Sequence, residues 1–85
     1  MTVVTPWGVA QTSRLYAEGI VFHSTASHGG FHLDADRNAR IPEEWRRADG
    51  RYEEDGDWAV VAMTFPDLFT QDERQLAERI IRHRR

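Results

Sequence analysis

Residues 20–33 read Ile20-Val-Phe-His-Ser-Thr-Ala-Ser-His-Gly-Gly-Phe-His-Leu33, and this stretch sets the architecture of the chain. Apolar side chains alternate in Ile20–Ser24 and again in Phe31–Leu33, a pattern typical of strands with one buried face. The segment between them, Ser24–Gly30, is small, polar and ends in two glycines, which predicts a loop. We therefore expect two neighbouring antiparallel strands joined through this loop.

A third strand is predicted on the N-terminal side of this pair. Gln11–Tyr16 is polar and moderately β-prone, and the short turn at residues 17–19 ends in a glycine that can adopt a positive φ. In the strand that follows, Ile20 and Phe22 lie on one face, with Val21 and His23 on the other. These segments favour an antiparallel sheet with one buried face.

The second half of the sequence is predicted to be helical. Pro42–Arg47 has a proline suited to the first position of a short helix. In Trp58–Phe65 the apolar residues recur at i, i+3, i+4 and i+7, which favours a helix; its valines leave a buried strand as the alternative. Thr70–Glu73 is a capping box that begins a last helix, with an apolar stripe formed by Leu76, Ala77, Ile80 and Ile81.

The prediction for the whole chain is an α+β fold. It consists of a three- to four-stranded antiparallel sheet packed by two to three helices, in a single domain of residues 1–85. The core should contain the large apolar residues of these elements: Phe22, Phe31, Leu33, Trp58, Val61, Phe65, Leu76 and Ile80.

Composition narrows the class of protein. Of the 85 residues 40% are apolar and 29% charged, as in soluble domains, and none is cysteine. The absence of cysteine excludes disulfides, thiolate metal sites and a cysteine nucleophile. The longest apolar stretch, Trp58–Met63, falls far short of the roughly 20 residues of a membrane-spanning helix. No signal peptide is apparent, so we expect a soluble, cytoplasmic protein.

Charge is unevenly distributed along the chain. Fourteen acids oppose eleven bases, all of them arginine, for a net charge of −3. Residues 1–51 carry six of each sign, residues 52–73 carry seven acids and no base, and residues 74–85 carry five arginines and one glutamate. An acidic segment of this density is suited to a basic surface on a partner. Helix capping and solubility are the alternative explanation.

The histidines raise a metal hypothesis. His23, His28 and His32 are separated by four and three residues, with Asp34 and Asp36 nearby. Zinc needs three or four ligands that converge tetrahedrally, and no established zinc motif is present. We therefore expect no metal and no cofactor, and we interpret these histidines as loop and strand residues.

Two further chemistries are weaker hypotheses. A hydrolase would use Ser24, Thr25 or Ser27 beside His28, but neighbours in one loop seldom form a nucleophile, base and orienting acid. A nucleic-acid-binding module would use the arginines, although these alternate with acids and no recognition motif appears. Its candidate residues are Arg37, Arg40, Arg46, Arg47 and Arg51, with those of the C-terminal tail. We expect a protein that is not an enzyme.

The loop residues Thr25, His28, Gly29 and Gly30 form a motif of their own. We interpret it as conformational, with the glycines serving the backbone and with Thr25 and His28 forming hydrogen bonds across the sheet. Gly29-Gly30 alone does not make a phosphate-binding loop, because the lysine and the following helix are missing.

Three motifs together resemble a small domain family of plasmids and phages of proteobacteria. They are Thr5-Pro6-Trp7-Gly8, the segment Ser24–Gly30, and Tyr52–Ala59 with its Glu-Glu-Asp run. The resemblance covers residues 5 to about 69, and Gly56 stands where a cysteine is common in that family. It implies a mobile-element protein of unassigned function.

A stand-alone copy of this size also resembles phage-encoded anti-CRISPR proteins. That resemblance implies a non-enzymatic inhibitor that binds a host CRISPR surveillance complex and obstructs its engagement of DNA. The partner-binding residues would be the acids that follow Tyr52: Glu53, Glu54, Asp55 and Asp57. No membrane partner is expected and direct nucleic-acid binding is not favoured. The alternative is a small nucleic-acid-binding or regulatory module that uses the arginines.

Overall fold

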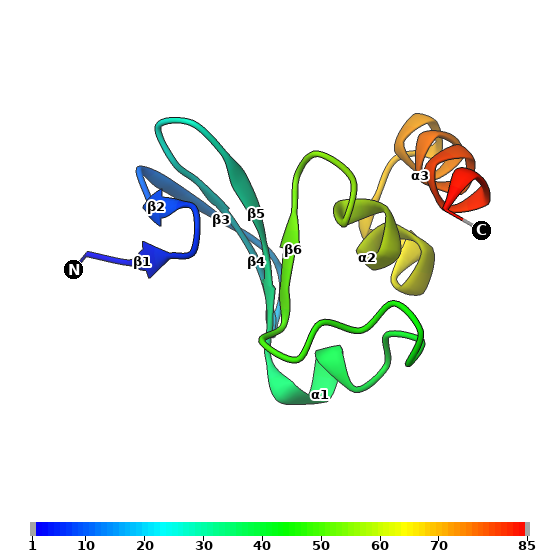
Figure 1. Cartoon of the computed structure of the whole chain (residues 1–85), viewed down its shortest axis with the longest axis horizontal. Coiled ribbons are helices and arrows are strands. Elements are labelled where there is room, and N and C mark those ends of the chain that lie inside the picture. The colour runs from blue at the N-terminus through cyan, green and yellow to red at the C-terminus, as the bar shows by residue number, and fades with distance from the viewer. Residues whose placement is uncertain (1, 85) are drawn as a thin grey trace.

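The computed structural model describes residues 2–84 and confirms the α+β fold (Figure 1). Residues 2–84 form two antiparallel sheets, of two and four strands, and three α-helices, the first of which precedes the last strand. The order of elements is β1 (Val4–Thr5), β2 (Gly8–Val9), β3 (Thr12–Ala17), β4 (Ile20–Ser24), β5 (Gly29–Leu33), α1 (Ala35–Asn38), β6 (Arg51–Glu53), α2 (Trp58–Thr64), the 3-10 turn η1 (Pro66–Leu68) and α3 (Gln71–His83).

The larger sheet has the order β3-β4-β5-β6, and each strand is antiparallel to its neighbour. Phe22 lies opposite Phe31, and Phe31 lies opposite Tyr52, so aromatic side chains cross the sheet on one face. The predicted turn at residues 17–19 is confirmed, and Gly19 has a φ of +84° there. The predicted loop is shorter than expected because Gly29 and Gly30 pair with β4 and belong to β5.

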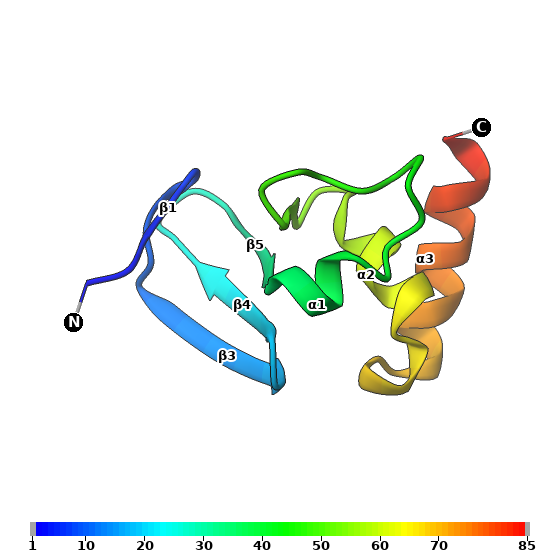
Figure 2. The ribbon, with the colours of Figure 1, turned by 90° about the horizontal axis from the view of Figure 1, so that it is seen from below.

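The helices cover the aromatic face of this sheet, and the β1–β2 hairpin lies on the opposite side (Figure 1). Figure 2 shows α1 and α2 between the sheet and α3. The helical prediction for Trp58–Phe65 is confirmed, as α2 spans Trp58–Thr64. The capping box of α3 is also confirmed, because Glu73 N–H donates to the Thr70 hydroxyl and Thr70 N–H donates to the Glu73 carboxylate.

The predicted core is partly correct. Phe31, Leu33, Val61 and Phe65 are buried, whereas Leu76 is 47% exposed. Helix α3 packs through Ala77 and Ile81, whereas Leu76 lines an open cleft. Three other predicted core residues are only partly buried against the core: Phe22, Trp58 and Ile80. The core also contains residues that the sequence analysis did not select: Ile20, Ile41, Tyr52, Ala59, Val60, Ala62, Phe69, Ala77 and Ile81.

The short helix predicted for Pro42–Arg47 is wrong. These residues form turns, with backbone bonds from Trp45 N–H to Pro42 and from Arg46 N–H to Glu43. The Arg46 guanidinium donates to the carbonyls of Ala39 and Ile41 at 2.8–3.0 Å. These bonds close residues 39–46 into a loop, and the side chain takes the Ile41 carbonyl that would accept the first backbone bond of a helix beginning at Pro42.

The N-terminal hairpin covers part of the second face of the sheet, which the sequence analysis expected to be open. Trp7 lies over Gly30, where an ideal Cβ would come within 2.6 Å of the indole Cζ2. The Thr5 hydroxyl donates to the Gly8 carbonyl at 2.7 Å and accepts from Trp7 N–H at 3.2 Å. Within residues 2–84, no helix is long and apolar enough to cross a membrane.

Candidate functional site

Two segments that are separate in the sequence meet at one end of the four-stranded sheet. Gly30 in β5 lies opposite Glu53 in β6, and Glu54 N–H donates to the Gly29 carbonyl at 2.9 Å. This register places the acidic residues that follow β6 beside the loop of residues 25–28. We call Glu53, Glu54 and Asp55 the acidic end.

The loop of residues 25–28 is closed by its own hydrogen bonds. Thr25 N–H donates to the His28 carbonyl at 2.7 Å, and His28 N–H donates to the Thr25 hydroxyl at 3.0 Å. The Thr25 hydroxyl also lies 2.5 Å from the His28 carbonyl and 3.3 Å from the Trp7 carbonyl. Thr25 therefore fixes the turn and ties it to the N-terminal hairpin. The bonds between Thr25 and His28 lie beside the Ser24–Gly29 pair, so they continue the pairing of β4 with β5.

The glycines of the motif allow close contacts rather than an unusual backbone. An added Cβ at Gly29 would lie 2.7 Å from the His23 carbonyl, 3.2 Å from the Phe22 ring and 3.3 Å from the Glu54 carboxylate. Gly30 has Trp7 above it, as described, and neither glycine has a positive φ. The absence of side chains therefore lets Glu54 on one face and Trp7 on the other approach β5.

His28 lies against the acidic end. Its Nδ1 is 3.9 Å from an Asp55 carboxylate oxygen, and both side chains are largely exposed. One ligand atom each from His28, Glu53 and Asp55 lie within 4.8 Å of one another. A hydrogen bond with the Asp55 carboxyl raises the pKa of Glu53. An imidazole and two carboxylates in this arrangement can ligate a divalent cation or accept bonds from a cationic side chain.

Asp57 differs from the other three predicted partner-binding acids. Its carboxylate lies 2.7 Å from the Arg84 guanidinium and 3.7 Å from that of Arg47. These contacts connect the start of α2 to the C-terminal end of α3. Asp57 is therefore neutralised within the chain. The remaining negative charge at this end of the sheet is that of the half-buried Glu53 and the exposed Glu54 and Asp55.

The structure separates His28 from the other two histidines of the metal hypothesis. His23 and His32 lie on the second face of the sheet, on β4 and β5. Burial and the nearby Arg51 guanidinium lower the pKa of both. The other predicted ligands are not part of the group around His28 either, and Asp34 caps α1 by accepting from Arg37 N–H at 2.9 Å.

A serine and a histidine do contact each other, but not in the loop of the hydrolase hypothesis. Ser13 Oγ lies 2.7 Å from His23 Nδ1, across β3 and β4. Nucleophilic catalysis by such a pair needs an acid that orients the imidazole. Among the hydrogen bonds and ion pairs of residues 2–84, none joins a carboxylate to His23. We therefore interpret this contact as a bond that satisfies a buried imidazole.

Most arginines of the nucleic-acid hypothesis have structural contacts. Arg37 donates to the Glu18 carbonyl at 3.0 Å and lies over the Phe65 ring at 5.1 Å. Arg46 closes the loop at residues 39–46, as described, and Arg47 lies beside Asp57. These side chains therefore do not form one exposed basic patch.

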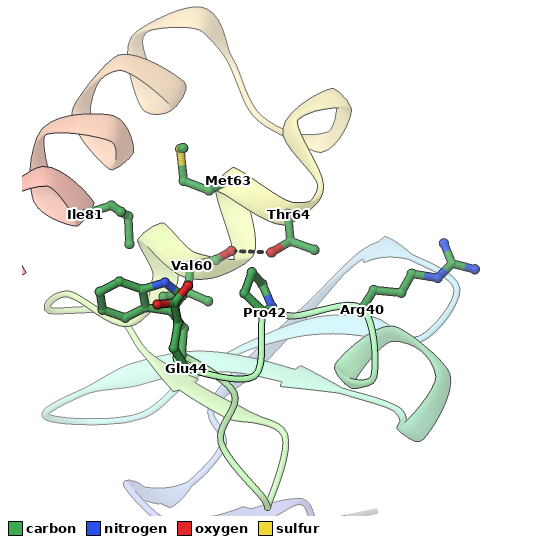
Figure 3. Close-up of a pocket in the computed structure, with 8 residues that line it drawn as sticks. Arg40, Pro42, Glu44, Val60, Met63, Thr64 and Ile81 are labelled. Carbon is green, nitrogen blue, oxygen red and sulfur yellow. Dashed lines mark hydrogen bonds between the residues drawn. The ribbon is translucent and has the colours of Figure 1, made fainter. Parts of the chain in front are cut away.

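Two of the clefts that residues 2–84 form are relevant to the site. The larger, of about 380 Å³, lies between the 40–45 loop and the two long helices (Figure 3). Its two charged lining residues, Arg40 and Glu44, have opposite signs, and Arg40 points away from the other labelled side chains. The Thr64 hydroxyl donates to the Val60 carbonyl at 2.8 Å and is thus engaged within α2. This cleft is mainly an apolar seam between the loop and the helices.

The second cleft adjoins the acidic end and has a volume of about 290 Å³. We call it the aromatic cleft, because five of its eight lining residues are aromatic: Tyr16, Phe22, Phe31, Trp58 and Phe69. Its other lining residues are Leu76 and two acids, Glu54 and Glu73. Three of these aromatic residues, Phe22, Phe31 and Trp58, were predicted from the sequence to lie in the core. The one sequence signal for accessible aromatic residues is their share of the chain, because 11% of 85 residues is more than so small a core can bury completely.

Comparison with known proteins gives a family and no function. No curated protein and no solved structure matches the chain. A family described as a domain of unknown function, DUF7007, matches residues 1–85. Because this match spans the whole chain, the protein belongs to the DUF7007 family.

Proposed function

We propose that the protein is a small, non-enzymatic inhibitor that binds a host CRISPR surveillance complex through its acidic end and obstructs the engagement of DNA. The observation that carries this proposal is the gathering of Glu53, Glu54 and Asp55 at one end of the sheet. Of the four acids that the sequence analysis selected, these three project without an arginine partner among residues 2–84.

Exposed carboxylates at this density complement a surface that binds phosphates. A protein that handles DNA presents arginines and lysines to the backbone of its ligand. Negative charge placed on those residues competes with DNA and accelerates association at low ionic strength. The small size of the chain and its resemblance to anti-CRISPR proteins support a surveillance complex as the DNA-handling partner.

The rigidity of the acidic end also supports a binding role. The 25–28 loop is closed by three hydrogen bonds beside it, and the backbone of Glu54 is bonded to Gly29. Because these bonds fix the backbone that carries the carboxylates, that backbone loses little conformational freedom on binding, which reduces the entropic cost of association.

The alternative, direct binding of nucleic acid through the arginines, is less well supported. Of its candidates, Arg37 and Arg46 hold the carbonyls of neighbouring loops, and Arg47 faces Asp57. Phosphate binding by these side chains would require their present contacts to be exchanged.

A phage-plating experiment tests the proposal. Bacterial strains that target a phage with type I, II or III CRISPR systems would express the chain, and the efficiency of plating would be measured. We expect the wild-type chain to restore plating in at least one strain. The triple variant Glu53→Lys, Glu54→Lys, Asp55→Lys should lose that effect, because it places three positive charges against a basic surface.

The matched control is the triple variant Glu18→Lys, Glu43→Lys, Asp67→Lys. It changes the net charge by the same amount at exposed positions outside the acidic end. We expect it to inhibit like the wild type. Equal activity of the two triple variants would contradict the role of the acidic end, and unaltered CRISPR targeting in every strain would contradict the inhibitor proposal.

A further inference from the structure

We propose that the aromatic cleft is a binding site for a single arginine side chain of the partner. This inference rests on the proposed function, since it identifies a feature of the basic surface that the acidic end meets. It assigns a binding role to the accessible sides of aromatic residues that belong to the core or pack against it.

The cleft is built from rings that contact one another. Phe31 lies at its centre, with ring centroids 4.9 Å from Tyr16, 4.9 Å from Phe22 and 5.7 Å from Phe69. Trp58 extends the cluster, 6.2 Å from Phe69. Phe31 and Phe69 are buried, whereas Tyr16, Phe22 and Trp58 are partly exposed. The cluster therefore has a closed floor and accessible walls.

Although the Arg14 guanidinium lies over the Tyr16 ring beside it, the aromatic cleft has charged lining residues of one sign only. Its two charged lining residues are Glu54 and Glu73. Glu73 is engaged in the capping box of α3, and Glu54 is exposed, with no hydrogen bond or ion pair from its side chain within residues 2–84. The Glu54 carboxylate lies over Gly29 and near the Phe22 ring, so it is held at the edge of the aromatic walls.

Aromatic faces beside a carboxylate suit a guanidinium ion. The group is planar and weakly hydrated, so it stacks on a ring while it donates to a carboxylate. Lysine, a compact and strongly hydrated charge, gains less from the same surroundings. The cleft can also accept the methylene stem of the side chain, which loses apolar surface to the rings.

The chain already binds its own arginines in this way. The Arg84 guanidinium donates to the Asp57 carboxylate at 2.7 Å and lies 5.8 Å from the centroid of the Trp45 ring. Arg14 lies over the Tyr16 ring at 4.8 Å, beside the aromatic cleft. The aromatic cleft likewise has a carboxylate, that of Glu54, beside aromatic rings.

A titration followed by NMR tests the site without the partner. The probes are N-acetyl-arginine methylamide, its lysine counterpart and N-acetyl-norleucine methylamide, which has an uncharged side chain. We expect saturable shifts of Trp58 and Phe69 with the arginine probe and weaker binding of the other two. The substitution Glu54→Gln should lower the affinity for the arginine probe about fivefold, as the loss of a partly exposed ion pair does. The control Asp67→Asn should leave it unchanged.

Three results would overturn the inference: no saturable shift with the arginine probe, norleucine binding as tightly as arginine, or Glu54→Gln without effect in a folded variant. Norleucine binding would indicate an apolar side chain as occupant. The comparison of probes in the wild-type chain does not depend on any variant. The titration contains no surveillance complex, so its failure would contradict the arginine site and not the proposed function. A failure in the plating experiment would contradict the proposed function and not the arginine site.

Discussion

Replacement of Gly30 by alanine tests the contact between the two glycine-containing motifs. The added Cβ would lie 2.6 Å from Trp7 Cζ2 and 2.6 Å from the Tyr52 carbonyl oxygen. Both distances are well below van der Waals contact, so either Trp7 or the pairing of β5 with β6 must shift. The backbone of Gly30 has no positive φ, and the effect is therefore steric rather than conformational.

The expected cost follows from overpacking of a close contact. An added methyl group in such a contact destabilises the folded state by about 1–3 kcal/mol. The lower conformational entropy of the unfolded alanine variant offsets about 0.4–1 kcal/mol of this loss. We expect a net loss of about 1–2 kcal/mol, which lowers the Tm of a chain this size by about 4–16 °C. Trp7 should also become more exposed as the hairpin moves, which would change tryptophan fluorescence.

Thermal and urea unfolding measure this loss, with Gly56→Ala as the matched control. At Gly56 the added Cβ would lie 3.1 Å from an Arg84 guanidinium nitrogen, the far end of a long side chain that needs to shift by only a few tenths of an ångström. We expect that variant to remain within about 0.5 kcal/mol of the wild type. Equal stability of the two variants, with unchanged fluorescence, would refute the packing of Trp7 on β5.

Three other perturbations have defined outcomes. Tyr52→Phe removes a buried hydroxyl that donates to Asn38 and accepts from a backbone N–H, and should cost about 1–2 kcal/mol in urea unfolding; a loss below about 0.5 kcal/mol would contradict it. The pKa of His23 is below its ordinary 6.5, so the unfolded chain binds a proton more readily and stability should fall as pH drops below that value. His23→Gln should flatten this pH dependence, and an unchanged profile would contradict it. Arg14→Gln removes a like charge beside the aromatic cleft and should tighten the arginine probe about twofold; weaker binding would show that Arg14 supports the site.

Local patterns predicted the elements whose signals lie within a few residues. The capping box at Thr70 and the helical spacing of Trp58–Phe65 both agree with the structure, because capping and amphipathicity act over one or two turns. The helix predicted for Pro42–Arg47 was wrong, because the Arg46 side chain donates to carbonyls of the preceding residues. The prediction that Leu76 lies in the core was wrong, because the apolar face of α3 is wider than the surface that it covers.

The candidate site depends on register, which the sequence does not display. Nothing in the spacing of His28 and Asp55 indicates that they approach to 3.9 Å, since the pairing of β5 with β6 brings them together. The four predicted acids looked equivalent until the fold placed Asp57 beside two arginines. The aromatic cleft also arises from tertiary packing, because Tyr16, Phe31 and Phe69 come from three distant segments.

The affinity of the purified chain for a purified surveillance complex, measured against salt concentration with and without target DNA, tests the central claim most directly. Contacts between the acidic end and a basic surface should weaken steadily as salt rises and screens the charges. We predict that target DNA and the chain exclude each other, and that the triple lysine variant of the acidic end binds at least about tenfold more weakly. Simultaneous binding of DNA and the chain, or equal affinity of the variant, would contradict the proposed function.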